Sequence, residues 1–302
     1  MSDVRPSTYP LPAVAGSASL DGRVCIVTGA ARGIGHATAR ALAERGATVV
    51  MLCRDGERGT LAVDAIRSAL PSADVALVVA DLSSFDALRH AADDIARRWP
   101  RVHVLVNNAA VSAARRRASH DGLELTLAVN HLAPYVLTRL LLPLLRAGAP
   151  ARVVNVTSEL ARWGSIDLED LESTRRYNGT RAYLQSKLAN LLFTSALAKR
   201  LEGTGVTANA VYPGLVATDL LRERWWWRAR WLNPLWRRLF LTPAEGAEAT
   251  VRAATAPEIA GLSGAVLTRS GRRVAPPRRA RDAALADRLW LRSAELTGLP
   301  PD

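Results

Sequence analysis

Lysine is nearly absent from this chain of 302 residues, because only Lys187 and Lys199 occur among its 40 basic residues and the rest are arginines. A net charge of +12 would favour nucleic-acid binding if the arginines formed one basic stripe. They are instead spread from Arg5 to Arg292, and no nucleic-acid-binding motif accompanies them. We therefore expect no nucleic-acid partner.

Cysteine and long apolar runs are also scarce. The only two cysteines, Cys25 and Cys53, lie in apolar strand-like runs, which predicts buried, reduced thiols. No continuous run of about 18 apolar residues occurs, so we expect no helix that spans a membrane. The first residues lack the basic start and apolar run of a signal peptide. The expectation is a cytoplasmic protein without a metal site.

The chain divides into a short arm and one long alternating region. Residues 1–20 are rich in Pro, Ser and Ala without periodicity, which predicts a mobile N-terminal arm. Over residues 21–302, seven short β-branched runs alternate with amphipathic helical patterns, and neither a linker nor an internal repeat interrupts them. This alternation predicts a single α/β domain of the doubly wound (Rossmann) type, with a seven-stranded parallel sheet and helices on both faces.

A glycine-rich turn follows the first predicted strand. The stretch "TGAARGIG", Thr28–Gly35, ends that strand and opens a helix. Gly29, Gly33 and Gly35 would permit the turn, the close approach of backbone to a ligand and tight helix packing, while the helix N-terminus faces a pyrophosphate. The turn therefore predicts a dinucleotide site.

The end of the second strand selects between NAD and NADP. Sites that prefer NAD place an acid there for the ribose 2′-hydroxyl, but this strand ends in Cys53 followed by Arg54. Arg32 in the glycine turn is expected to reach the same ribose, and two guanidinium groups suit a 2′-phosphate. The predicted cofactor is NADP(H). The alternative is two solvated arginines, and Asp55 would weaken the preference if it turned inward.

Tyr183 and Lys187 are spaced i and i+4 in "RAYLQSKLAN", which places both on one face of a helix. A phenol titrates near pH 10, so a tyrosine acid/base needs help at neutral pH. An ammonium about 5 Å away contributes about 3 kcal/mol toward the phenolate at an effective dielectric near 20. A surface Tyr–Lys pair is the alternative, but the scarcity of lysine favours the catalytic interpretation.

Four motifs in this order, "TGAARGIG", "NNAA", "AYLQSK" and "YPG", resemble the short-chain dehydrogenase/reductase family from about Asp21 onward. The long gap between Ser158 and Tyr183, the stretch "SKLANLLFTSALAKRL" and the ending "LTGLPPD" resemble its retinol-dehydrogenase-like branch. Ala110 stands where the family usually has glycine, which matters only if that turn needs a positive φ.

The resemblance implies roles for particular residues. Tyr183 would exchange a proton with the substrate oxygen, Lys187 would assist it and hold the nicotinamide ribose, and Ser158 would orient the carbonyl. Asn130 would hold a water in a proton relay. The implied cofactor contacts are Gly29, Arg32, Gly33, Ile34, Gly35, Arg54, Asp81, Leu82, Asn107, Ala109, Tyr183, Lys187, Pro213, Gly214, Val216 and Thr218. A homodimer paired through the helices of Asn130 and Tyr183 is implied as well.

The segment Leu220–Phe240 holds five of the eight tryptophans and six arginines. In the family this region, here residues 216–242, covers the substrate, and we expect a lid. Trp227 and Trp231 would share one helical face, and Trp236 would share another with Phe240. Contact with a membrane surface in addition, or a protein interface, remains open as an alternative.

These features together predict an NADP(H)-dependent oxidoreductase that interconverts a carbonyl and an alcohol on a bulky apolar small molecule. Ketone or aldehyde reduction is the expected direction, because NADPH is usually kept reduced in cells. One alternative is a non-catalytic NADP-binding scaffold or sensor, which would not need the tyrosine and lysine. Another is an atypical family reaction, such as alkene reduction, epimerisation or reductive cyclisation.

Overall fold

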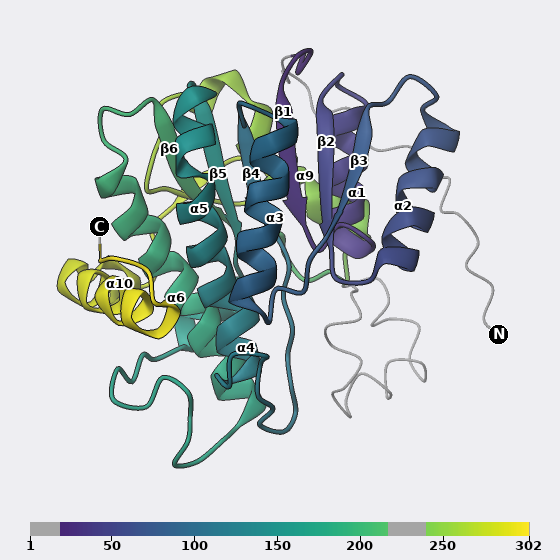
Figure 1. The fold of residues 1–302 in the computed structure, drawn as a ribbon. Helices are drawn as coiled ribbons and strands as arrows, with labels where there is room; N and C mark the ends of the chain where they lie inside the picture. The colour runs from purple at the N-terminus through teal and green to yellow at the C-terminus, as the bar shows by residue number, and fades with distance from the viewer. Residues whose placement is uncertain (1–18, 217–239, 302) are drawn as a thin grey trace.

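The structure is a computed structural model that describes residues 19–216 and 240–301 (Figure 1). The lid residues Trp227, Trp231 and Trp236, and Thr218 of the predicted cofactor loop, lie outside the described residues, as do residues 1–18 of the predicted arm. Leu20, at the end of that arm, is buried, and its N–H donates to the Arg45 carbonyl at 2.8 Å. The folded domain therefore includes Leu20.

An eight-stranded sheet with the order β3-β2-β1-β4-β5-β6-β7-β8 forms the centre of the fold. The strands are β1 (Val24–Thr28), β2 (Thr48–Cys53), β3 (Val75–Val79), β4 (Val104–Asn107), β5 (Ala151–Val156), β6 (Val206–Val211), β7 (Val266–Leu267) and β8 (Arg273–Val274). The first seven are parallel, as predicted.

The prediction of a seven-stranded sheet was one strand short. The chain turns back after β7, where the Thr268 N–H donates to the Arg272 carbonyl, and β8 pairs antiparallel with β7. A strand of two residues is too short to show a hydrophobic alternation, so the pattern could not reveal it.

Helices cover both faces of the sheet (Figure 1). They are α1 (Gly33–Ala43), α2 (Gly56–Ala69), α3 (Phe85–Arg98), α4 (Leu125–Leu127), α5 (Ala133–Ala147), α6 (Gly179–Arg200), α9 (Pro243–Thr255) and α10 (Ala283–Thr297). Short turns are η1 (Ala128–Leu132), η2 (Glu159–Trp163), η5 (Pro257–Ile259) and η6 (Arg278–Arg281). One buried core lies under α3, α5 and α6, and a second lies under α1, α2 and α9.

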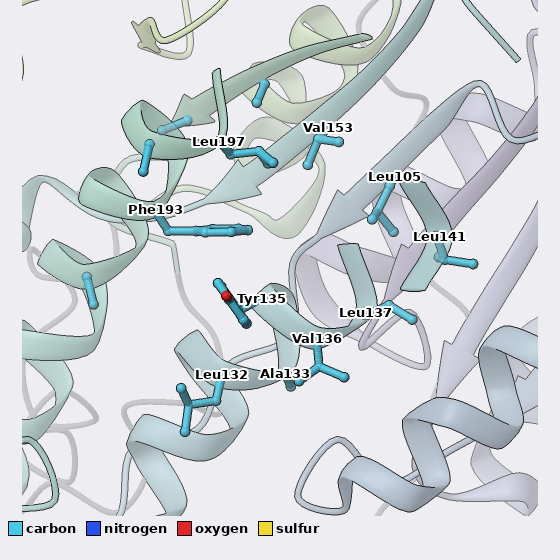
Figure 2. Close-up of a cluster of buried hydrophobic side chains, with 14 of the residues drawn as sticks. Leu105, Leu132, Ala133, Tyr135, Val136, Leu137, Leu141, Val153, Phe193 and Leu197 are labelled. Carbon is cyan, nitrogen blue, oxygen red and sulfur yellow. The ribbon is translucent and has the colours of Figure 1, made fainter. Parts of the chain in front are cut away.

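Aromatic rings join α5, α6 and α10 in the larger core. Figure 2 shows Tyr135 of α5 facing Phe193 of α6, with ring centroids 5.8 Å apart. Trp290 of α10 adds its ring 4.9 Å from Tyr135 and 6.0 Å from Phe193. The C-terminal helix thus packs on the two helices that the sequence analysis assigned to dimer contacts, and the homodimer stays a prediction.

The expectation that no helix could span a membrane needs one correction. By length and composition the run Leu125–Ala147 qualifies, with a mean hydropathy of 1.3. Its apolar residues are interrupted by Asn130, His131 and Arg139, so no continuous apolar run marks it in the sequence. Because 78% of the qualifying window is buried inside the protein, the helix has the environment of a core helix.

The sheet order reverses next to β1, which pairs with β2 on one side and with β4 on the other. The chain continues from β1 toward β2 and from β4 toward β5, and in sheets of this kind ligands bind beyond the carboxyl ends of the strands at such a point. The glycine turn after β1 and the segments after β4, β5 and β6 therefore meet at one edge of the sheet.

Candidate active site

The glycine turn packs directly on the start of α1. A Cβ at Gly35 would lie 2.4 Å from the Gly29 carbonyl oxygen and 2.5 Å from Asn108 Nδ2, distances that side-chain atoms do not tolerate. Gly29 has φ +66°, which favours glycine. The turn therefore needs glycine at position 35 for packing and at position 29 for its backbone conformation.

Asn108, which the sequence analysis did not select, holds this turn in place. Its side chain donates to the Thr28 carbonyl at 2.8 Å, and the N–H groups of Asn108 and Ala109 both donate to Thr28 Oγ1 at 3.0 Å. The Asn107 side chain donates into the interior, to Thr138 and Asn155, and its place under the cofactor stays a prediction. The two asparagines of "NNAA" thus have different tasks, and their alternating direction along the strand is the signal that separates them.

The N-terminus of α1 has the features of an anion site. Arg32 occupies the N-cap position with an extended backbone, its side chain makes no capping hydrogen bond, and no acidic residue lies in the first turn. The first N–H groups of a helix lack intrahelical acceptors and favour a negative charge. Together with the glycine packing, this arrangement fits the pyrophosphate of a dinucleotide.

The end of β2 carries no negative charge toward the predicted ribose position. Cys53 is buried, and burial raises the pKa of its thiol to about 11, so it stays neutral at pH 7. Asp55 turns to its own helix, where its carboxylate accepts from the Arg58 N–H at 3.1 Å and pairs with the Arg58 guanidinium. Arg54 and Arg32 are exposed. The acid that would have opposed NADP is therefore engaged as the cap of α2.

The remaining predicted cofactor residues lie around the same edge. Asp81 accepts from the Ser83 N–H at 2.8 Å, and Leu82 is buried in the core beside it. Val216 pairs with Leu241 in an isolated bridge, so a residue that follows β6 lies beside one that precedes α9. The implied contacts Ile34, Pro213 and Gly214 belong to the glycine turn and to the segment after β6, and they stay predictions.

Ala110 does not have a positive φ, since Ser173 is the one residue other than glycine that does among the described residues.

Tyr183 and Lys187 lie on one face of α6, with Lys187 Nζ 5.7 Å from the centre of the Tyr183 ring. Lys187 is 3% exposed, and its ammonium donates to the Val156 carbonyl at 3.1 Å. Burial lowers the pKa of Lys187 to about 8, so the side chain stays mostly charged at pH 7. A desolvated positive charge beside a phenol favours its phenolate, as the sequence analysis required.

Ser158 and Asn130 approach α6 from two other segments. Ser158 follows β5 by two residues and caps η2, where its hydroxyl accepts from the Leu160 N–H at 3.2 Å. Asn130 lies fully buried in η1, which is a π-helical turn. Its side chain accepts from the Val111 N–H at 2.7 Å and donates to the Val111 carbonyl and to Ser186. The structure thus brings Asn130 to the helix of Tyr183 and Lys187.

The glycine turn at the start of α1 and the Tyr183–Lys187 pair on α6 are the arrangement expected of a nicotinamide-dependent dehydrogenase. The family model for the short chain dehydrogenases matches residues 23–229, and the chain belongs to this family. Within it the chain is retinol-dehydrogenase-like. It is 43% identical to human retinol dehydrogenase 12 over 93% of this chain and 88% of that protein, and 40% identical to human retinol dehydrogenase 11 over 94% and 88%.

Solved structures agree with this assignment. An uncharacterised protein from Mycobacterium paratuberculosis matches with a TM-score of 0.78 and 34% identity, over 95% of this chain and 97% of that one. An NADPH-bound short chain oxidoreductase from Pseudomonas aeruginosa PAO1, described as having an atypical catalytic centre, matches with a TM-score of 0.67 and 26% identity, over 83% and 96%. The chain is therefore an oxidoreductase of a family that binds a nicotinamide cofactor.

Proposed function

We propose that this protein is an NADP(H)-dependent reductase that converts a ketone or aldehyde on a bulky apolar molecule to the alcohol. The observation that carries the proposal is the pairing of Tyr183 with a buried, mostly charged Lys187 on α6. The Lys187 ammonium donates to a carbonyl and pairs with no carboxylate among the described residues, which keeps its field available to the tyrosine.

The residues divide the chemistry among them. When bound, the nicotinamide supplies or accepts the hydride. Tyr183 donates the proton to the substrate oxygen, and the charge of Lys187 stabilises the phenolate that remains. Ser158, on the segment after β5, orients the same oxygen through its hydroxyl. The reverse steps would serve oxidation, and the reduced state in which cells usually keep NADPH favours reduction.

Two observations support NADP(H) over NAD(H). Arg32 and Arg54 are exposed at the predicted ribose position, while Asp55 is occupied as a helix cap. Guanidinium groups bind phosphate through paired, charge-assisted hydrogen bonds. A second Pseudomonas aeruginosa structure, described as an active-site complex with NADP, is 29% identical and has a TM-score of 0.66.

The substrate class follows from the tryptophan-rich segment and from the relatives' names. The described residues Val216 and Leu241, which flank this segment in the chain, pair in an isolated bridge. The tryptophans of the segment would supply an apolar cover, and the curated relatives are named as retinol dehydrogenases. A bulky apolar alcohol or carbonyl compound fits both observations.

The test is a screen for NADPH oxidation against ketones and aldehydes of graded size, with NADH in parallel. We expect turnover with NADPH, and kcat/KM rising with apolar bulk. An absence of turnover across the panel, in protein that still binds NADPH, would favour the non-catalytic scaffold instead.

A further inference from the structure

Four polar residues on α6 form one stripe, and two of them contact Asn130 of η1. Tyr183, Ser186, Lys187 and Asn190 are spaced at i, i+3, i+4 and i+7, which places them along one side of the helix. Ser186 accepts from Asn130 Nδ2 at 3.0 Å, and Asn190 Nδ2 donates to the Asn130 main-chain carbonyl at 2.8 Å. Ser186 and Asn190, which lie before and after Lys187 along α6, therefore both contact Asn130.

The Asn130 carbonyl cannot form the usual α-helical hydrogen bond, and Asn190 on α6 supplies a donor to it. In an α-helix it would accept from the N–H of residue 134, but that residue is Pro134, which has no N–H. The local chain forms the π-helical turn η1, and Asn130 is completely buried. A buried carbonyl without a donor is costly, and the Asn190 amide supplies one.

Two further buried residues fix the orientation of Asn190. Its Oδ1 lies 3.3 Å from His131 Nδ1, and His131 Nε2 lies 2.9 Å from Ser293 Oγ of α10. Because the Asn130 carbonyl only accepts, Asn190 must present its NH₂ there and its oxygen to His131.

The orientation of Asn190 also fixes which nitrogen of His131 carries the proton. His131 carries its proton on Nδ1 and donates to Asn190, and its Nε2 accepts from the Ser293 hydroxyl. That hydroxyl has a single proton, which it shares between His131 Nε2 and the Leu289 carbonyl of α10 at 2.7 Å. The hydrogen bonds therefore run from Ser293 through His131 and Asn190 to Asn130, and they link the C-terminal helix to the candidate active site.

We propose that Asn190 is a positioning residue for Asn130, and that His131 and Ser293 orient it, so that α10 supports catalysis from behind the active site. The inference rests on the proposed reductase function. Asn190 would fix the η1 turn against the helix that carries Tyr183 and Lys187, and its loss would displace Asn130 relative to the substrate without removing a cofactor contact.

Asn190→Asp provides the sharpest test, because the two side chains have the same shape. An ionised aspartate cannot donate to the Asn130 carbonyl, whereas a protonated one can donate there and still accept from His131. At about pH 8.5 we expect kcat to fall roughly tenfold or more, with the NADPH dissociation constant unchanged within about threefold. The ratio of mutant to wild-type kcat should recover as the pH is lowered to about 6. Asn190→Leu should show no recovery. A flat ratio overturns the proposal.

Ser293→Ala tests the contribution of α10 with a milder change. Thr297→Val is its matched control, since Thr297 has a buried hydroxyl one turn further along α10 that donates to the Ser293 and Ala294 carbonyls of its own helix. We expect Ser293→Ala to lower kcat by severalfold and to speed hydrogen exchange in residues 128–133, and Thr297→Val to do neither. Equal effects of both variants overturn the coupling.

The two proposals fail in distinguishable ways. A wild-type protein that turns over no carbonyl compound refutes the reductase function, and the hydrogen-exchange comparison then still decides whether Ser293 holds the η1 turn. Wild-type turnover together with unaffected Asn190 and Ser293 variants refutes the positioning role alone.

Discussion

The ammonium of Lys187 donates to the main-chain carbonyl of Val156 at 3.1 Å, which ties α6 to the carboxyl end of β5. Thr157 reinforces this connection, because its hydroxyl donates to the Lys187 carbonyl at 2.9 Å. Ser158 is the next residue along the chain. The strand end that presents the serine is thus fixed to the helix that presents the tyrosine and the lysine, and a substrate oxygen between them would meet both hydroxyl groups.

Cofactor selection is expected to depend on Arg54. Arg54→Ala should raise the NADPH dissociation constant at least tenfold, because a charge-assisted hydrogen bond to phosphate contributes about 1.5–3 kcal/mol. NADH binding should change little, since NADH lacks the 2′-phosphate. Titrations of both cofactors would measure this, with Arg146→Ala at the end of α5 as the control. Equal weakening of both cofactors would show that Arg54 does not contact the 2′-phosphate.

The tryptophan-rich segment should act on large substrates selectively. We expect Trp227→Ala or Trp231→Ala to lower kcat/KM for a bulky apolar ketone far more than for a small one. Truncating a buried aromatic costs about 3–5 kcal/mol in a core, and a cover over a substrate should cost less. Trp99→Ala, on the end of α3, controls for the general loss of a tryptophan.

A membrane-contacting segment would give a different result. The same variants would then keep their activity on soluble ketones but lose co-sedimentation with anionic vesicles, as would a variant with Arg224, Arg228 and Arg230 neutralised. Unchanged kinetics for both ketones in both tryptophan variants would refute the lid.

The buried His131 should make stability fall in mild acid. Burial lowers the pKa of His131 from the ordinary value near 6.5 to about 4. Between these values the unfolded chain takes up a proton that the folded protein does not. The stability therefore falls as the pH drops from about 6.5 to 4, by about 3 kcal/mol for this group.

Denaturant unfolding at several pH values would measure this loss. His131→Gln should flatten the dependence in that window, while His90→Gln, at a side chain that is 75% exposed, should leave it unchanged. Parallel curves for wild type and His131→Gln would contradict the assignment.

The sequence allowed the fold to be predicted where the pattern was long and regular. The seven parallel strands and the Tyr183–Lys187 spacing depend on hydrophobic period and helical geometry, which a sequence displays directly. The strand β8 was missed because two residues show no period. Asn108 and Asn190 were missed because their importance comes from partners far away in the chain, Thr28 and Asn130, and no local pattern indicates such contacts.

Turnover by Tyr183→Phe, measured beside NADPH binding, tests the central claim most directly. The substitution removes only the hydroxyl, which is expected to donate the proton and to add little to cofactor affinity. We expect NADPH oxidation with the best ketone of the panel to be abolished, while the NADPH dissociation constant stays near the wild-type value. Turnover within about tenfold of wild type, a barrier change of only about 1.4 kcal/mol, would contradict the assignment of Tyr183 as the proton donor.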